Sequence, residues 1–367
     1  MKVIKRILAV VLVLVVVLSM SACIHKKDEI AVTVGNVEFK AAYYLCALIN
    51  ADMEAKQKVQ ENETQAAEEG VNEEIDYFSK KIDGKKYVNW VEDTAIENLG
   101  NIAAYKTLCK EKKIKLTTEK KNEAEEMSSY YWTSYGYSAL FEPNGVSETT
   151  YKDYMLDSYY AEEYFQYVYG EKGTKALKKA DVKKEIADNY ILVDVLQTNY
   201  TEEMSDADKK AAKAKLQDYA DAINAGEKTY DEVYREFNNI NEEETEDKTE
   251  NSKDDKKTAD PINKYATVMG AEGTNFESED YATYRKYKVD TPKVVEPEDK
   301  SGVKLVIKRS ISKDEYYMDS LDTYARHTLA DEDFKKEIKE YVNGMETKIN
   351  KYAISEFDVK DIVYSQS

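Results

Sequence analysis

The spacing of apolar residues changes between helical and strand patterns along this chain, and this change limits the folds that the chain can adopt. Up to about residue 185 the apolar residues recur mostly three and four positions apart, which is typical of helices. From Tyr190 to Leu196 they form one compact run of strand length, and helical spacing returns by Lys313. We therefore predict an α+β protein, mainly helical, with a smaller α/β region in its second half.

The first helical region opens with two short strands. Residues 30–34 and 37–39 have strand composition, and Gly35-Asn36 between them predicts a turn. The helices expected after them begin at about Ala41, cover 88–112 and, after the capping residues Thr117 and Thr118, reach Met127.

Tyrosine is frequent, with 31 residues, and many of them flank a turn predicted at Pro143-Asn144-Gly145. One interpretation is packing between helices with the hydroxyl groups at the surface. The other is an adaptable aromatic surface that holds extended polypeptide, and the two are compatible. The candidate client-binding residues are Tyr131, Trp132, Tyr135, Tyr160 and Tyr164.

The apolar run at 190–196 is followed by clear helix signals. Ser205, with Asp208 three residues later, is a variant of the capping box, and Gly226 is placed to end that helix. A short helix is expected at 231–237, and a further strand at 303–308.

The remaining segments differ in how much apolar surface they can bury. Residues 238–260 are acidic and of low complexity, which predicts a disordered loop, and 61–74 predict a loop or a solvated helical extension. Residues 313–351 are expected to be helical and amphipathic. Their apolar stripe consists of Phe334, Ile338, Tyr341, Val342, Met345 and Ile349.

The first 22 residues have the pattern of a signal peptide. Basic residues precede an unbroken apolar run at 7–18, which is shorter than the roughly 20 residues that span a bilayer. Small residues then lead directly into Cys23, which indicates lipidation rather than an ordinary signal or a membrane anchor. We expect residues 23–29 to be a lipidated tether at the extracytoplasmic face of a bacterial membrane.

Composition excludes several functions. The formal net charge of −19 should repel nucleic acid, so no DNA or RNA partner is expected. With only two histidines, His25 and His327, a multi-histidine metal site or a catalytic triad is not expected, nor is any cofactor. Cys46 and Cys109 lie in apolar helical contexts, where either a disulfide or two buried free thiols is possible.

The order of these parts resembles the extracytoplasmic parvulin-type foldases of the PrsA/SurA kind. The similar stretches are IAVTVGNVEFKAAYYLCAL, YILVDVLQT with the helices after it, and SGVKLVIKR. The resemblance implies a helical chaperone domain of the SurA N-terminal kind, formed by 30–185 with 311–367. It also implies an inserted, divergent parvulin-like α/β domain at 186–310.

The chain departs from the family at two positions of the parvulin pattern. Histidines of the family's first and last strands are replaced by Asp194 and Lys304, which leaves these two as the candidate catalytic residues. Prolyl isomerisation needs no nucleophile, because a shaped pocket that holds a twisted amide lowers the barrier. The interpretation that we favour for Asp194 is a solvent-facing or capped strand residue.

The resemblance and the aromatic helices together predict a lipid-anchored chaperone, or foldase, for unfolded or partly folded secreted polypeptides. Its isomerase activity is in question because both family histidines are absent. One alternative is an active peptidyl-prolyl isomerase with a non-standard pocket. Others are a solute-binding lipoprotein or a structural one, although the repeated βα pattern of two-lobed binders is missing.

Overall fold

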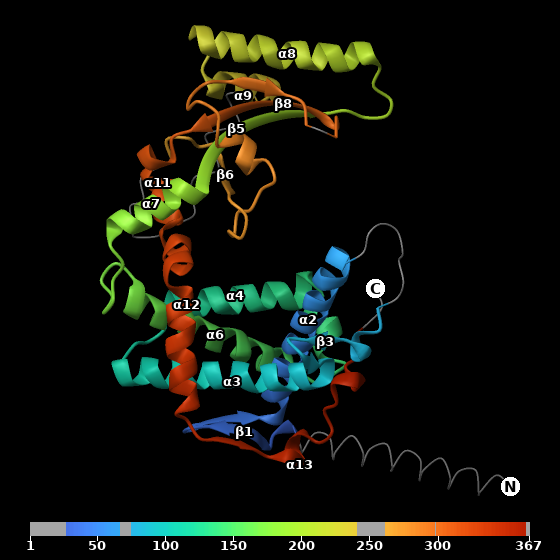
Figure 1. Ribbon diagram of the computed structural model, residues 1–367, viewed down its shortest axis with the longest axis vertical. Helices are drawn as coiled ribbons and strands as arrows, with labels where there is room; N and C mark the ends of the chain where they lie inside the picture. Colours follow the sequence, from blue (N-terminus) through green and yellow to red (C-terminus); the bar gives the residue numbers. More distant parts are fainter. Residues whose placement is uncertain (1–26, 67–74, 241–260, 298, 365–367) are drawn as a thin grey trace, which may run out of the picture. The chain divides into compact units, whose positions relative to one another are not determined.

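The computed structural model describes residues 27–66, 75–240, 261–297 and 299–364 (Figure 1). The chain divides into two compact units. Unit 1 contains the described residues up to Val168 together with those from Glu332 onward, and unit 2 is Tyr169–Asp331. The prediction of an α+β fold is confirmed. Cys23 and most of the acidic stretch 238–260 lie outside the described residues.

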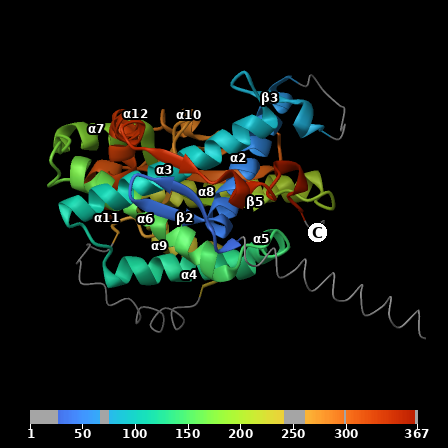
Figure 2. The same ribbon diagram turned by 90° about the horizontal axis from the view of Figure 1, so that it is seen from below.

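Unit 1 combines long helices with a small antiparallel sheet. In that sheet β1 (Ile30–Val34) lies between β2 (Val37–Lys40) and β9 (Thr347–Ile349), and it packs against the two longest helices (Figures 1 and 2). The other elements are α2 (Ala41–Ala66), η1 (Tyr77–Ser79), β3 (Lys81–Ile82), β4 (Lys85–Lys86), α3 (Tyr87–Lys112), α4 (Thr118–Ser134), α5 (Tyr137–Phe141), α6 (Glu148–Tyr169), the later part of α12 (Asp322–Asn343), α13 (Lys351–Ile354) and η4 (Val359–Asp361).

The core of unit 1 forms where α2 and α3 face each other. Leu48 and Ile49 on α2 and Leu99 on α3 are fully buried, and alanines on both helices allow the backbones to approach. Each buried side chain of this size stabilises the fold by about 2–3 kcal/mol. The regularly spaced apolar residues seen in the sequence therefore lie on the helix faces that form this core.

Helix α4 begins where the sequence predicts and ends later. The Thr117 hydroxyl accepts a hydrogen bond from the amide of Lys120 at 3.2 Å, as expected of an N-cap. The helix then continues past Met127 to Ser134, because Trp132 packs into the core and fixes the last turns. The first tyrosines of the aromatic segment thus lie on a helix.

Unit 2 is built on a four-stranded antiparallel sheet of order β6-β5-β8-β7. The strands are β5 (Tyr190–Asn199), β6 (Thr267–Gly270), β7 (Lys293–Val295) and β8 (Gly302–Arg309). The helices are α7 (Lys179–Asn189), α8 (Asp206–Ala225), α9 (Tyr230–Phe237), α10 (Tyr281–Tyr284), η3 (Ile311–Lys313), α11 (Glu315–Ser320) and the start of α12.

Both faces of this sheet are buried. Helices α8 and α9 cover one face, where Leu196 and Ile307 pack among their apolar residues (Figure 1). The other face carries Val193 and Val306 against tyrosines of α10. The capping box of Ser205 and Asp208 is present, and Gly226 ends α8 at φ 72°, as predicted.

The expectation of helix throughout 313–351 is wrong at its end. Residues Thr347–Ile349 form β9, which pairs with β1, and Ile349 is 43% exposed and not part of an apolar helical stripe. The strand is held by backbone hydrogen bonds, since all three of its side chains are exposed. Strand β9 therefore cannot be predicted from the hydrophobicity of its side chains.

Gly302 provides a test of the β5–β8 pairing. It lies opposite Asn199, and a Cβ atom there would come within 2.5 Å of the Thr198 carbonyl oxygen, a backbone atom of the ladder. We expect Gly302→Ala to lower the free energy of unfolding by about 1–3 kcal/mol, measured by urea denaturation with hydrogen exchange at β5 and β8.

Gly273→Ala is the matched control, because Gly273 has φ 80° but open space around the new Cβ atom. Its cost should stay near the roughly 1 kcal/mol of an unfavourable backbone angle, without faster exchange in β8. Equal exchange in both variants would contradict the close approach at Gly302.

Candidate functional site

The turn between α4 and α5 gathers aromatic side chains in two layers. The inner layer is buried: Trp132 is 4% exposed and stacks on Phe141 with ring centroids 6.3 Å apart. Tyr151 of α6 completes this layer at 5.5 Å from Trp132. Trp132, predicted as a client-binding residue, is thus a core residue that supports the layer above it.

The outer layer, which we call the aromatic surface, consists of Tyr130, Tyr131 and Tyr135. Tyr135 is 63% exposed and Tyr130 is 51% exposed, and their rings meet edge to face at 5.5 Å. Tyr131 is half-buried and stacks on Tyr137 at 5.7 Å. Gly136, at φ 73°, makes the bend that brings α5 beneath these rings. The result is a preassembled patch of rigid amphipathic rings.

Tyr160 and Tyr164 do not belong to the aromatic surface. Both are half-buried on α6, where Tyr164 packs against Tyr167 and Phe334 at 6.0 and 6.1 Å. The carbonyl of Tyr160 accepts a hydrogen bond from the Cys109 thiol at 3.6 Å. The structure therefore brings Tyr131, Trp132 and Tyr135 together and places the other two candidates in helix packing.

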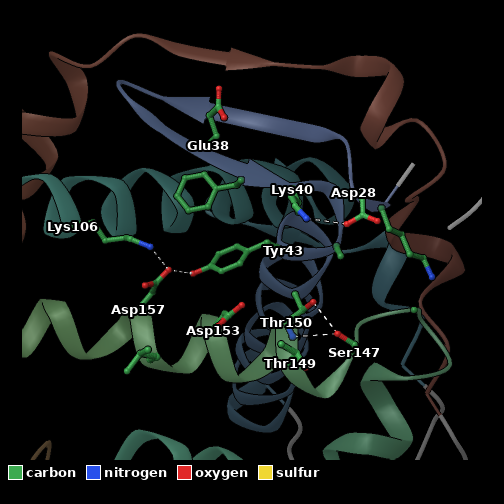
Figure 3. Close-up of a pocket in the computed structure, with 15 residues that line it drawn as sticks. Asp28, Glu38, Lys40, Tyr43, Lys106, Ser147, Thr149, Thr150, Asp153 and Asp157 are labelled. Carbon is green, nitrogen blue, oxygen red and sulfur yellow. Dashed lines mark hydrogen bonds and ion pairs between the residues drawn. The ribbon is translucent and has the colours of Figure 1, made fainter. Parts of the chain in front are cut away.

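A pocket of about 640 Å³ opens between β2, α2 and α6 (Figure 3). On one wall the Tyr43 hydroxyl donates to Asp157 at 2.9 Å, and the Lys106 ammonium donates to the same carboxylate oxygen at 2.7 Å. Burial and the Asp157 charge raise the pKa of Tyr43, so its hydroxyl stays protonated. At the mouth, Lys40 pairs with Asp28 at 3.0 Å.

Sequence reasoning missed this pocket because its residues come from separate elements with no shared motif. Two of its cationic residues, Lys40 and Lys106, are paired with Asp28 and Asp157. The arrangement offers polar contacts to a ligand.

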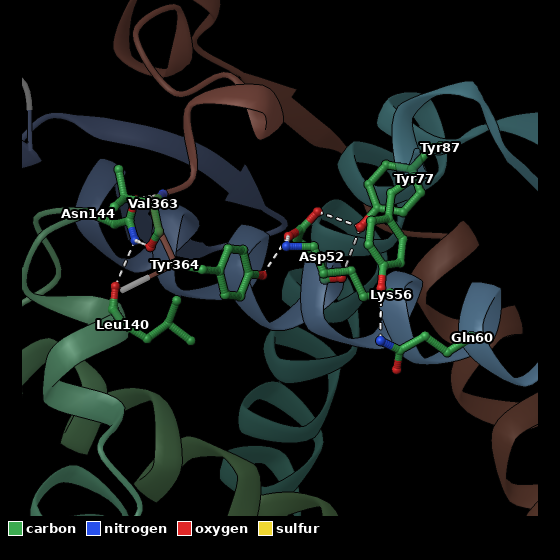
Figure 4. A network of polar contacts seen from close by, with 9 residues as sticks. All are labelled: Asp52, Lys56, Gln60, Tyr77, Tyr87, Leu140, Asn144, Val363 and Tyr364. Carbon is green, nitrogen blue, oxygen red and sulfur yellow. Dashed lines mark hydrogen bonds and ion pairs between the residues drawn. The ribbon is translucent and has the colours of Figure 1, made fainter. Parts of the chain in front are cut away.

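A second polar network centres on Asp52 of α2, which is 1% exposed (Figure 4). The Tyr87 hydroxyl donates to one carboxylate oxygen at 2.7 Å, and the Tyr364 hydroxyl donates to the other at 2.5 Å. Lys56 lies 3.4 Å from the second oxygen. Three donors therefore compensate the buried charge, which would otherwise cost several kcal/mol.

In unit 2, Asp194 is neither solvent-facing nor capped, contrary to one of the two interpretations of the sequence. It is 2% exposed, and Arg309 donates to its carboxylate at 2.5 Å. Burial raises the pKa of Asp194, although Arg309 opposes the shift. The other carboxylate oxygen and the Tyr230 hydroxyl are buried without hydrogen-bond partners among the described residues.

Lys304 lies on the opposite face of the same sheet. In the β5–β8 register Asp194 is opposite Ile307, in the core beneath α8 and α9, whereas Lys304 is opposite Gln197 on the alternate face. Lys304 pairs with Asp280 at 2.9 Å. The two catalytic candidates therefore cannot line one pocket.

The remaining reactive residues are held in structural contacts. His327 bonds through Nδ1 to Asp331 at 2.6 Å on α12. Cys46 and Cys109 are buried and free, so they form no disulfide. Burial raises the pKa of Cys109 to about 11, which keeps it a thiol at neutral pH. Among the described residues, no helix has the length and apolarity to cross a bilayer.

Comparison with known proteins returned similar structures. The foldase protein PrsA of Lactococcus lactis aligns with 13% identity and a TM-score of 0.39, over 89% of this chain and 97% of that one. PrsA of Streptococcus pneumoniae aligns with 13% identity and a TM-score of 0.37, over 71% and 87%. Both are foldases of the kind that the sequence resembles. No family model and no curated protein matches the sequence.

The Asp194–Arg309 pair yields a stability prediction. Asp194→Ala would leave a largely buried guanidinium short of its main partner, and we expect a loss of about 3 kcal/mol in the unfolding of unit 2. Asp290→Ala removes the other carboxylate on Arg309, which is 59% exposed, and should cost less than about 1 kcal/mol. Urea denaturation of both variants measures the difference, and equal losses would refute the buried role of Asp194.

Proposed function

We propose that this protein is a membrane-tethered extracytoplasmic chaperone that helps secreted polypeptides to fold. The observation that carries the proposal is the aromatic surface of Tyr130, Tyr131 and Tyr135 over a rigid buried base. Tethering is proposed from the signal-like residues 1–22 and from Cys23, which follows them. The clients are unfolded or partly folded chains with exposed apolar segments.

The physical chemistry of the surface suits transient binding. Tyrosine rings bury a large area at little conformational cost, and their hydroxyls can bond to water or to a client backbone. A shallow patch of three rings gives weak affinity, so that a client can leave once it folds. The net charge of −19 keeps the chaperone soluble and disfavours nucleic acids as competitors.

We propose that unit 2 is a divergent parvulin-like domain that acts as a scaffold. Asp194 is 2% exposed beneath two helices and one of its carboxylate oxygens is paired with Arg309, so a proline peptide cannot reach it. Lys304 is paired with Asp280 on the other face. Neither candidate offers the open polar pocket that would stabilise a twisted amide.

The aromatic surface is tested by a double variant, Tyr130→Ser with Tyr135→Ser. Loss of two exposed rings, each worth about 0.5–1.5 kcal/mol of contact, should raise the concentration needed for half-suppression of client aggregation by about tenfold. The measurement is light scattering of a chemically unfolded secreted protein diluted into buffer with the mature chain.

Tyr352→Ser is the matched control, since Tyr352 is 62% exposed, close to the 63% of Tyr135, but lies on α13 away from the aromatic surface. It should leave suppression unchanged. The free energy of unfolding of all three proteins should agree within about 0.5 kcal/mol. If the folded wild-type chain fails to slow aggregation, the chaperone proposal is wrong.

The scaffold role of unit 2 predicts no catalysis of prolyl isomerisation. The cis–trans rate of a proline-containing tetrapeptide, measured by exchange NMR, should equal the uncatalysed rate set by a barrier of about 18–20 kcal/mol. Acceleration by the wild-type chain that Lys304→Ala abolishes would instead establish a divergent isomerase.

A further inference from the structure

The Asn144 side chain binds Val363, in a distant part of the chain, only through the backbone of Val363. Its side-chain amide donates to the Val363 carbonyl at 2.8 Å, and its side-chain oxygen accepts from the Val363 amide at 2.8 Å (Figure 4). The Val363 side chain is 52% exposed and adds little to this contact. Asn144 therefore recognises an extended polypeptide without regard to the side chain at that position.

The support around Asn144 is preorganised. Its amide also donates to the Leu140 carbonyl at 2.7 Å, which fixes the orientation of the side chain. The turn that carries it is closed by backbone bonds from Gly145 to Glu142 at 2.8 Å and from Val146 to Phe141 at 2.9 Å. A rigid donor–acceptor pair of this kind loses little entropy when it binds a peptide.

The next residue of the held segment is recognised by its side chain. The Tyr364 hydroxyl donates to the buried Asp52 carboxylate at 2.5 Å, and the Lys56 ammonium lies 3.1 Å from the centroid of the Tyr364 ring. Without this hydroxyl, one oxygen of a 1%-exposed carboxylate would lose a donor. The site thus selects tyrosine over phenylalanine.

We propose that Asn144, Asp52 and Lys56 form a polypeptide-binding site for extended segments that contain a tyrosine, and that residues 362–364 occupy it as an internal competitor. A client segment with a tyrosine would displace the internal one. Since the internal segment is present at an effective concentration of about a millimolar, only clients with exposed tyrosines at high local concentration would compete. The proposal extends the chaperone function to a second site and does not depend on the aromatic surface.

The test uses the fluorescently labelled peptide acetyl-Asp-Ile-Val-Tyr-amide and the full mature chain. Tyr364→Ala should open the site, so that the peptide binds at least about tenfold more tightly than to wild type in fluorescence anisotropy. A peptide with phenylalanine in place of tyrosine should bind about tenfold more weakly. Adding Asn144→Ala to the opened chain should abolish binding, whereas Asn122→Ala, an exposed asparagine on α4, should not.

A second measurement needs no variant. An excess of the peptide should accelerate hydrogen exchange at the Val363 amide of the wild-type chain, because that amide loses its bond to Asn144. Unchanged exchange, equal binding of the two peptides, or binding that survives Asn144→Ala would each overturn the proposal. Binding should persist in the Tyr130→Ser/Tyr135→Ser variant, so failure of the aromatic surface and failure of this site are distinguishable.

Discussion

The helical unit depends on a pairing between strands from opposite ends of the described chain. β9 joins β1 in an antiparallel ladder, and the Asn350 side chain reaches the carbonyl of Ile30, 320 residues earlier. Gly35 and Asn350 add backbone bonds of 2.9 and 2.8 Å at the two ends of the ladder. This closure makes one unit from two segments separated by the whole of unit 2, and such non-local contacts form slowly during folding.

The success of the sequence predictions follows from which physical signal each element carries. Strand β5 and helix α8 were predictable because an apolar run, a capping box and the terminal glycine Gly226 are all local signals. Strand β9 was not predictable, because its three side chains are exposed and only its backbone makes the pairing contacts. The burial of Asp194 was equally invisible, because its partner Arg309 is 115 residues away.

The candidate site was predicted in part for a related reason. A cluster of tyrosines is evident in the sequence, but exposure depends on the bend at Gly136 and on which rings lie below. Trp132, at 4% exposure, and Tyr135, at 63%, lie only three positions apart on one helix and its cap, just before that bend. Composition identified the segment, and tertiary packing determined which rings face the solvent.

Buried carboxylates account for three further tyrosines. Asp52 collects hydroxyls from Tyr87 and Tyr364, and Asp157 collects one from Tyr43. A protonated phenol gives a buried carboxylate a strong hydrogen bond without adding a further charge to desolvate, and one lysine beside each carboxylate, Lys56 or Lys106, supplies the opposite charge. Where such a carboxylate is held by tyrosines from distant segments, one segment can leave and another hydroxyl can replace it. Tyrosine therefore stabilises the fold, forms the aromatic surface and, at Tyr364, makes the contact that a client tyrosine would replace.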